Sequence, residues 1–170
     1  DVLLCLRDGN AYLHLILGEK ILLRGDHNVS NVLAAFAIGH AAGLPLDAML
    51  TAVEDFHGVA HRLELVRELR GVRWYNDSIA TAPERTMAAI RAFEEPIVLL
   101  LGGRDKDLPW GDLADLIHQR VDHVVLFGEA AEKIEKAVAG PGSRPRTLSC
   151  CETLEQAVSK AAEVAEAGGV

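Results

Sequence analysis

The sequence predicts an α/β fold in which a mostly parallel β-sheet, flanked by helices, follows a smaller β-plus-helical region. After about residue 58, apolar strands and amphipathic helices alternate at regular intervals, which is the order typical of a parallel sheet. These strands are apolar along their whole length, as in "PIVLLLGG", which indicates that helices cover both faces. We therefore predict two regions, residues 1–58 and residues 59–170.

The first region is expected to contain strands and then two helices. Residues 1–23 alternate apolar runs with the turn sequences "RDGN" and "LGEK", which predicts a small β-meander. Apolar residues then recur at helical spacing, with Asn28 as the expected N-cap and Gly43 as the expected stop. A second helix is expected over Leu46–Phe56.

The second region is expected to repeat a strand-helix unit. The expected strands are Val72–Asn76, Ile97–Leu101, His123–Phe127 and Thr147–Cys151, and the expected helices are Pro83–Phe93, Trp110–Gln119, Glu129–Val138 and Leu154–Ala167. Pro83 suits the first position of its helix. Ligands of such sheets bind at the loops that leave the carboxyl ends of the strands, so we expect the site in the loops after the first two strands.

Composition excludes several classes of protein. The net charge of -8, with acidic and basic residues interspersed, argues against a nucleic-acid surface. Every apolar run is far shorter than the roughly 20 residues of a membrane span. Three cysteines without metal-ligand spacing favour a reducing cytoplasm and no disulfide framework. The scattered histidines predict no metal site. The opening "DVLLCL" without Met and the ending "AEAGGV", after which another strand is expected, indicate a fragment.

Two polar motifs lie at or before the predicted boundary. In "GDHNVSN", His27 precedes Asn28 and Asn31, which are three apart and share one helix face. Capping alone would explain the asparagines, but paired amides at a helix start also suit a heterocycle edge or a phosphate. In "HRLE", His61 and Arg62 form either a solvated hinge or a site where a planar guanidinium reaches a phosphate.

Two further motifs follow predicted strands. "NDSIAT" places Asp77 and Thr81 in the first strand-to-helix loop. Turn chemistry with an Asx-type cap and contact with a ligand at the carboxyl end of the strand explain its short polar side chains equally well. "LLLGGRDK" places Asp105 and Lys106 after the next strand, behind glycines that would let backbone approach a ligand. Lys106 is either a solvated charge or, because its loop neighbours the first, a ligand-binding cation.

Taken together and in this order, "GDHNVSNVLAA", "FHGVAHRLE", "NDSIATAPE" and "LLLGGRDK" resemble the Mur ligases, most closely the type that adds D-glutamate. The resemblance covers nearly the whole chain. It implies that residues 1–58 are the end of a central ATPase domain. It also implies that residues 59–170 are most of a Rossmann-like C-terminal domain that holds the amino acid.

The resemblance also implies a reaction and roles for residues. ATP phosphorylates the carboxylate of UDP-N-acetylmuramoyl-L-alanine, and D-glutamate attacks the acyl phosphate, in peptidoglycan precursor synthesis. Carried over by motif, the contacts to the nucleotide come from His27, Asn28, Asn31, His61, Arg62 and Asp77. Arg62 and Lys106 are the implied catalytic residues, and Thr81 and Lys106 the implied contacts to the amino acid. ATP and Mg²⁺ are expected, with the metal ligands mostly outside this sequence, and the complete enzyme is expected to be a cytoplasmic monomer.

This sequence departs from the family pattern in one loop. Ile79 stands where the family usually has a lysine that faces the acyl phosphate, and Ala82 stands where it usually has an asparagine. The missing cation would then come from Arg85 or Arg104, or the enzyme adds L-glutamate or another amino acid. The remaining alternative is a Rossmann-like module without catalytic activity that binds a nucleotide or a protein. Residues 1–170 alone are expected to lack ligase activity, because the family's phosphate loop is not among them.

Overall fold

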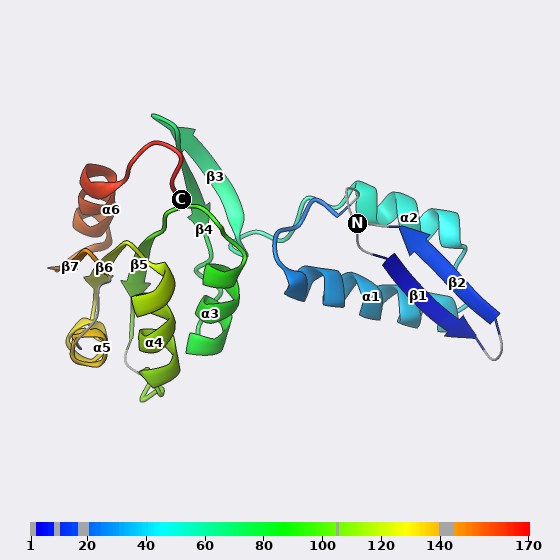
Figure 1. Ribbon diagram of the computed structural model, residues 1–170, viewed down its shortest axis with the longest axis horizontal. Coiled ribbons are helices and arrows are strands. Elements are labelled where there is room, and N and C mark those ends of the chain that lie inside the picture. The colour runs from blue at the N-terminus through cyan, green and yellow to red at the C-terminus, as the bar shows by residue number, and fades with distance from the viewer. Residues whose placement is uncertain (1–2, 9–10, 17–20, 105, 140–144) are drawn as a thin grey trace. The chain divides into compact units, whose positions relative to one another are not determined.

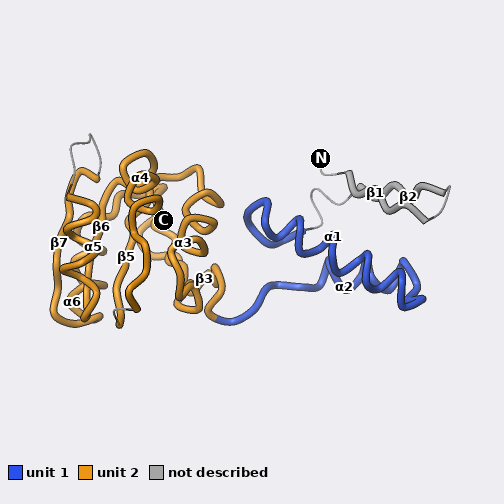
Figure 2. The backbone as a smooth tube through the Cα atoms, turned by 90° about the horizontal axis from the view of Figure 1, so that it is seen from below, with its two compact units in different colours: residues 1–60 blue, residues 61–170 orange. Residues whose placement is uncertain are grey.

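The computed structural model describes residues 3–8, 11–16, 21–104, 106–139 and 145–170, and for residues 3–16 the backbone alone (Figure 1). The chain divides into two compact units, residues 1–60 and 61–170 (Figure 2). The sequence placed the boundary at residue 58.

Unit 1 contains an antiparallel pair of strands and two helices. Strand β1 (Leu3–Asp8) pairs with β2 (Ala11–Ile16), and the predicted turn "LGEK" lies outside the described residues. Helix α1 spans Asp26–Ala41 and α2 spans Leu46–Glu54. The two helices pack through Val32 and Phe36 of α1, against partly buried residues that include Leu50 and Val53 of α2.

The start of α1 differs from the prediction, whereas its end agrees with it. The N-cap is Gly25 rather than Asn28, which lies in the first turn. Gly25 adopts φ 88° and its carbonyl accepts the Asn28 N–H at 2.9 Å, so glycine's access to positive φ starts the helix earlier. At the other end, Gly43 adopts φ 76° just past the C-cap Ala42, as predicted for a C′ glycine.

Unit 2 contains five strands and four helices among its described residues. Its elements are β3 (Glu64–Leu69), β4 (Val72–Asn76), α3 (Pro83–Arg91), β5 (Val98–Gly102), α4 (Gly111–Arg120), β6 (His123–Phe127), α5 (Ala131–Val138), β7 (Thr147–Cys151) and α6 (Leu154–Val164). Strands β5, β6 and β7 form a parallel sheet in that order. The predicted elements are all present, and the largest error at an end is three residues, where α6 stops at Val164 instead of Ala167.

Helices cover both faces of the parallel sheet, as predicted. Helix α6 packs on β5, β6 and β7, while α5 packs on β5 and β6 and joins α4 and α3 in one layer. The larger core, on the side of α3 to α5, is built around Ile117, Val124, Leu126 and Ile134, which are at most 1% exposed. On the α6 side, Val125 of β6 packs with Ala157 and Ala161.

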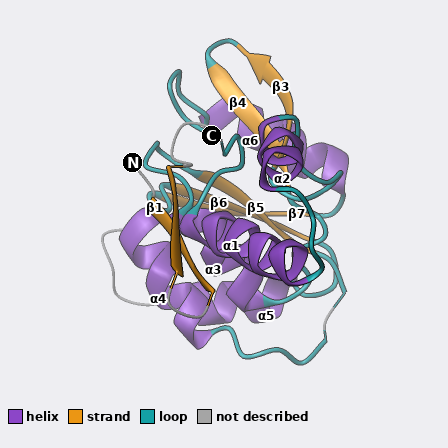
Figure 3. Cartoon of the chain, turned by 90° about the vertical axis from the view of Figure 1, so that its right-hand side faces the viewer, coloured by secondary structure: helices purple, strands orange, loops and turns teal. Residues whose placement is uncertain are grey.

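The prediction for Val72–Asn76 was wrong about its partners. This segment is a strand, but it pairs antiparallel with β3, a strand that the sequence did not predict, in a separate two-stranded sheet. Figure 3 shows β3 and β4 as a pair of strands separate from β5, β6 and β7. Strand β3 is exposed at five of its six residues, so it lacks the buried apolar run from which the other strands were identified.

Candidate active site at the carboxyl ends of the strands

The segment at the start of unit 2 is fastened to the loop that follows β4. The carbonyl of His61 accepts the N–H of Ile79 at 3.2 Å, and its ring Nδ1 lies 2.9 Å from Asn76 Nδ2. Asp77 Oδ1 accepts the N–H of Leu63 at 3.1 Å. The motifs "HRLE" and "NDSIAT", which are separated in the sequence, are therefore joined by hydrogen bonds in the folded chain.

Arg62 lies at the centre of this fastened segment. Its neighbours His61 and Leu63 both adopt left-handed backbone conformations, with φ 65° and 44°. Such conformations cost of order 1–3 kcal/mol each in residues other than glycine, and they cluster at functional sites. Glu64 Oε2 accepts the His61 N–H at 2.8 Å and helps to hold the segment. The result is an exposed Arg62 side chain on a strongly constrained backbone.

The loop after β4 is a compact turn that leads into α3. Asn76 Oδ1 accepts the N–H of Ser78 at 3.0 Å, and the carbonyl of Asp77 accepts the N–H of Ala80 at 2.8 Å, so turn chemistry accounts for part of the motif. Thr81 follows and is exposed. Pro83 is the first residue of α3, as predicted. The Asp77 carboxylate is only half-buried.

A cation lies on the same loop. Arg85, in the first turn of α3, donates from Nη1 to the carbonyl of Ile79 at 3.3 Å. The Ile79 side chain is 44% exposed. The isoleucine at this position, where the resembled family usually has a lysine, is therefore not part of the hydrophobic core. Positive charge is thus present beside Ile79, although it comes from another residue.

Two consecutive positions, the last residue of β5 and the first residue of the loop after it, are glycines for different structural reasons. A Cβ at Gly102 would come within 1.9 Å of the Phe127 carbonyl oxygen, so that glycine serves contact with β6 rather than with a ligand. Gly103 adopts φ 111°, and no atom lies within 4 Å of where its Cβ would be. Gly103 is therefore the position at which backbone could approach a ligand. Lys106 is exposed, and Asp105 lies outside the described residues.

Both loops border one cavity of about 670 Å³ in unit 2, a size common for ligand pockets. Asp77 and Ser78 line it from the β4 loop, and Gly103 lines it from the β5 loop. Thr81 and Lys106 are not among the lining residues. The hydrogen bonds described above hold Asp77 beside the segment that contains His61 and Arg62. Thr81 and Lys106 are exposed on the two loops.

The candidate residues of unit 1 form a separate cluster at the start of α1. Asn28 is 7% exposed; its Nδ2 donates to the Arg24 carbonyl at 2.8 Å, and its Oδ1 accepts from Asn31 Nδ2 at 3.2 Å. Asn31 itself is exposed and His27 is half-buried. The two asparagines do share a face, and the buried one orients the exposed one.

Two residues that position the His61 segment of unit 2 were not singled out from the sequence. Asn76 and Glu64 both hold the His61 segment, and the only available signal was that they lie within the two motifs. No group of three His, Cys, Asp or Glu that could hold a metal ion occurs in the described parts of the chain. Within the same parts, no helix is long and apolar enough to span a bilayer.

Comparison with known proteins identifies the family of the chain. Residues 61–170 match the family described as "Mur ligase, glutamate ligase domain". The chain is 43% identical over 166 residues to the UDP-N-acetylmuramoylalanine–D-glutamate ligase of Roseiflexus sp. (strain RS-1), covering 96% of this chain and 36% of that protein. It is 42% identical over 167 residues to the ligase of that name from Symbiobacterium thermophilum, covering 95% and 35%.

Solved structures show the same fold. A crystal structure of MurF from Acinetobacter baumannii superposes with a TM-score of 0.66 at 21% identity, covering 91% of this chain and 33% of that one. The chain spans about a third of the length of these relatives. The family match over residues 61–170, most of the chain, shows that the chain belongs to the Mur ligase family.

Proposed function

We propose that this chain is part of an ATP-dependent ligase that joins D-glutamate to UDP-N-acetylmuramoyl-L-alanine in peptidoglycan precursor synthesis. In this reaction the γ-phosphoryl group of ATP passes to the precursor carboxylate, giving ADP and an acyl phosphate. The amine of D-glutamate then attacks the acyl carbon, forms the amide and releases phosphate. Residues 1–58 would belong to the ATPase domain of that enzyme and residues 59–170 to its amino-acid domain.

The observation that best supports this proposal is the constrained backbone around Arg62. Three contacts fix the segment to the β4 loop, through Ile79, Asn76 and Asp77. A solvated hinge would need no such fixation, whereas a guanidinium that neutralises charge on a transferring phosphoryl group must be held in place. The strain at His61 and Leu63 then belongs to the arrangement that holds Arg62.

The remaining roles in unit 2 follow from position. Asp77 lines the cavity and, on this proposal, contacts the ribose of ATP while it holds Leu63. His61 would lie near the base. Thr81 and Lys106, both exposed on neighbouring loops, would hold the carboxylate of the incoming amino acid, with Lys106 supplying charge and Thr81 orientation.

In unit 1 the cluster at α1 would meet the adenine side of ATP. Because Asn28 is buried and both the Nδ2 and the Oδ1 of its side-chain amide form hydrogen bonds within unit 1, its role would be to position Asn31. Asn31 and His27 would make the direct contacts. Mg²⁺ would accompany ATP, and we assign no metal ligand to this chain. The partners are small molecules, and the complete enzyme would act as a monomer in the cytoplasm.

A related activity is the second candidate, and Ile79 is the observation that favours it. Without a lysine at this position, the loop has lost a cation that would face the acyl phosphate and the amino acid. Arg85 lies beside Ile79 and would replace that charge in a D-glutamate enzyme. If it does not, the complete enzyme would add L-glutamate or another amino acid.

The test is substitution of Arg62 in the complete protein. Arg62→Lys should lower kcat by about 100-fold or more, because an ammonium group cannot reproduce the guanidinium fork. ADP release would be measured with ATP, the UDP-muramoyl precursor and D-glutamate. Arg67→Lys, on exposed strand β3, is the matched control and should leave kcat unchanged.

Two outcomes would count against the proposal. If Arg62→Lys alters thermal stability but not kcat, then the segment is a hinge. If the complete protein binds ATP and forms no amide with any amino acid, then the chain belongs to a nucleotide-binding module without catalytic activity.

A further inference from the structure

The ring of His61 contacts a side chain whose own orientation is fixed. Asn76 is the last residue of β4 and lies opposite Glu64 in the ladder of β3 and β4. Its Oδ1 accepts the N–H of Ser78 at 3.0 Å. Because a backbone N–H can only donate, this atom must be the oxygen of the amide, and the other atom must be its NH₂ nitrogen.

The orientation of Asn76 decides which ring nitrogen of His61 carries the proton. Asn76 Nδ2 lies 2.9 Å from His61 Nδ1, within hydrogen-bond range. An amide NH₂ group donates and does not accept, so Nδ1 must be the acceptor. In a neutral imidazole the proton then lies on Nε2. A doubly protonated ring would place an N–H against the NH₂ group and lose this bond.

Glu64 is the competing partner of Nδ1. Its Oε2 lies 3.8 Å from Nδ1 and would favour a proton there. That distance is too long for a hydrogen bond, and the same oxygen already accepts the backbone N–H of His61 at 2.8 Å. The two side chains are 63% and 42% exposed, so water weakens their attraction. The shorter contact with Asn76 therefore prevails.

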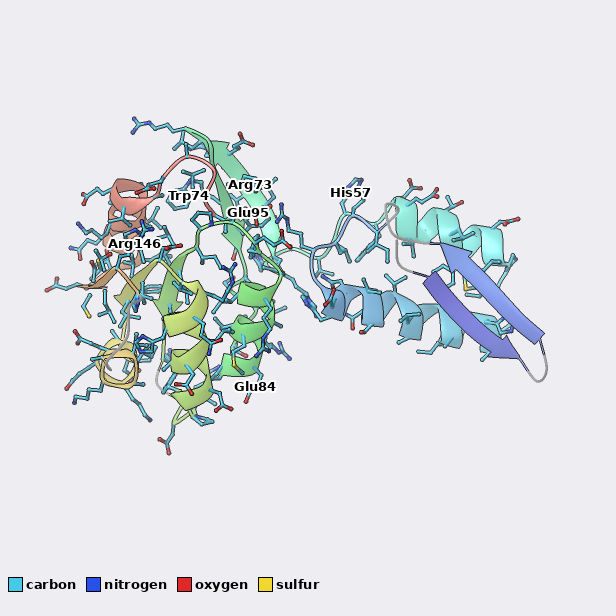
Figure 4. The ribbon with its side chains drawn as sticks, in the orientation of Figure 1. His57, Arg73, Trp74, Glu84, Glu95 and Arg146 are labelled. Carbon is cyan, nitrogen blue, oxygen red and sulfur yellow. The ribbon has the colours of Figure 1, made fainter. Side chains whose placement is uncertain are left out.

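Two other charged groups near this end of β4 have partners of their own. Asp77 Oδ1 accepts the N–H of Leu63 at 3.1 Å. Arg73, the charged residue of β4, forms an ion pair with Glu95, and Figure 4 labels both side chains. The Asn76 amide is thus the polar group that orients the ring.

The ring contact is not required to hold the backbone. The carbonyl of His61 accepts the N–H of Ile79, and Asp77 holds the residue two positions further on. Both bonds would persist without the ring. The ring's Nε2 forms no hydrogen bond with any residue that the structure describes. The contact with Asn76 therefore sets the proton of a nitrogen that is available to a ligand.

We propose that Asn76 is a positioning residue that keeps His61 neutral with its proton on Nε2, so that His61 offers the nucleotide a hydrogen-bond donor. The ligand atom at Nε2 is then an acceptor, such as a ring nitrogen of adenine. The contact with the nucleotide rests on the proposed function, whereas the position of the proton rests on the contacts within unit 2 alone.

The position of the proton is read from the ¹⁵N chemical shifts of the imidazole nitrogens in the chain of residues 1–170, at about pH 8, where an ordinary histidine is neutral. His61 Nδ1 should have the shift of an unprotonated nitrogen, and Nε2 that of a protonated one. Asn76→Asp still accepts the Ser78 N–H but replaces the NH₂ donor by an acceptor, so it should move a proton to Nδ1. A protonated Nδ1 in the unmodified chain would overturn the proposal.

Two controls belong to this measurement. His61→Leu identifies the His61 signals by their loss. His123, whose Nδ1 lies 2.6 Å from Thr147 Oγ1, should keep its shifts in Asn76→Asp.

The role of the donor is tested by ATP binding to the complete protein. His61→Leu removes the donor, whereas His61→Gln keeps an NH₂ group near the place of Nε2. Neither replacement is glycine or β-branched, so the two carry similar strain at φ 65°. By calorimetry, His61→Leu should raise the Kd for ATP by on the order of tenfold, and His61→Gln by less than about threefold.

The two variants also separate this inference from the proposed function. An equal rise in Kd for His61→Leu and His61→Gln would overturn the donor role, even in an active ligase. Binding of ATP needs no turnover, so the expected difference in a protein that forms no amide would support the donor role and count against the ligase.

Discussion

Two aspartates of unit 2 make the same kind of bond at opposite ends of the strands. Asp122 precedes β6, is 5% exposed and accepts the N–H of Ile97 at 3.3 Å. Asp77 follows β4, is half-buried and accepts the N–H of Leu63 at 3.1 Å. Each carboxylate therefore holds a neighbouring segment of backbone.

The two aspartates differ in what surrounds them. Asp122 ties together the amino ends of all three parallel strands, through Ile97 and through Arg146, whose N–H donates to the Asp122 carbonyl and whose Nε lies 3.6 Å from its carboxylate. Asp77 lines a cavity and fixes the strained segment around Arg62. A hydrogen bond to backbone therefore does not by itself distinguish a carboxylate buried at the amino ends of the strands from one that lines a cavity at their carboxyl ends. The two differ in burial and in the end of the strand at which they lie.

The largest expected effect is the loss of stability on replacing Asp122, at the amino ends of the parallel strands. Asp122→Ala should lower the free energy of unfolding of unit 2 by about 2–3 kcal/mol, because it leaves a buried N–H without its acceptor. Asp77→Ala should cost about 1 kcal/mol, since water can reach its partner. Both tryptophans, Trp74 and Trp110, lie in unit 2, so urea unfolding followed by tryptophan fluorescence reports this unit alone. Equal losses from the two variants would contradict the comparison.

The next effect concerns the carboxyl ends and the identity of the amino acid. In the complete enzyme, Ile79→Lys should improve kcat/KM for D-glutamate by an amount equivalent to about 1–3 kcal/mol, because it adds a charge-assisted contact to the carboxylate. Ile79→Met, of similar size and uncharged, is the control and should have little effect. Loss of activity in Ile79→Lys, with a preference for another amino acid in the unmodified enzyme, would instead support the second candidate function.

The smallest expected effect is on the reactivity of the Cys150 thiol, near the carboxyl end of β7. Burial raises the pKa of the Cys150 thiol, and Glu135 raises it further through its charge and a hydrogen bond. A raised pKa means less thiolate at pH 8, so alkylation of Cys150 by iodoacetamide should be slower than that of an unstructured cysteine. Glu135→Gln should accelerate it, measured by mass spectrometry in a Cys5→Ser background. An unchanged rate would show that Glu135 does not act on the thiol.

The sequence predicted most of the elements because their signals are local. Buried strands such as His123–Phe127 are continuous apolar runs, and Pro83 and Gly43 mark helix ends by their own backbone preferences. Strand β3 was missed because Arg67 and Glu68 interrupt its apolar residues at exposed positions. The partner of β4 was assigned wrongly because pairing depends on contacts that no single segment encodes.

The sequence predicted which loops carry the candidate site, but it did not predict which of their residues contact one another. The motif residues were named from their positions after strands, but the fastening of His61 to Asn76 joins residues 15 apart in sequence. The buried position of Asn28 was also hidden, since the helix starts at Gly25 through a glycine conformation. Arg85 was one of two arginines considered for the missing charge, and only the structure places it beside Ile79.

On the proposed function, the loop after β4 presents Asp77 to the nucleotide and Thr81 to the amino acid. Steady-state kinetics of the complete enzyme test it most directly. Asp77→Asn should raise mainly the KM for ATP, and Thr81→Ala should raise mainly the KM for the amino acid, because the first residue lines the cavity, whereas the second is exposed and does not line it. Equal changes in both KM values for both variants, or loss of stability without any change in KM, would contradict the claim.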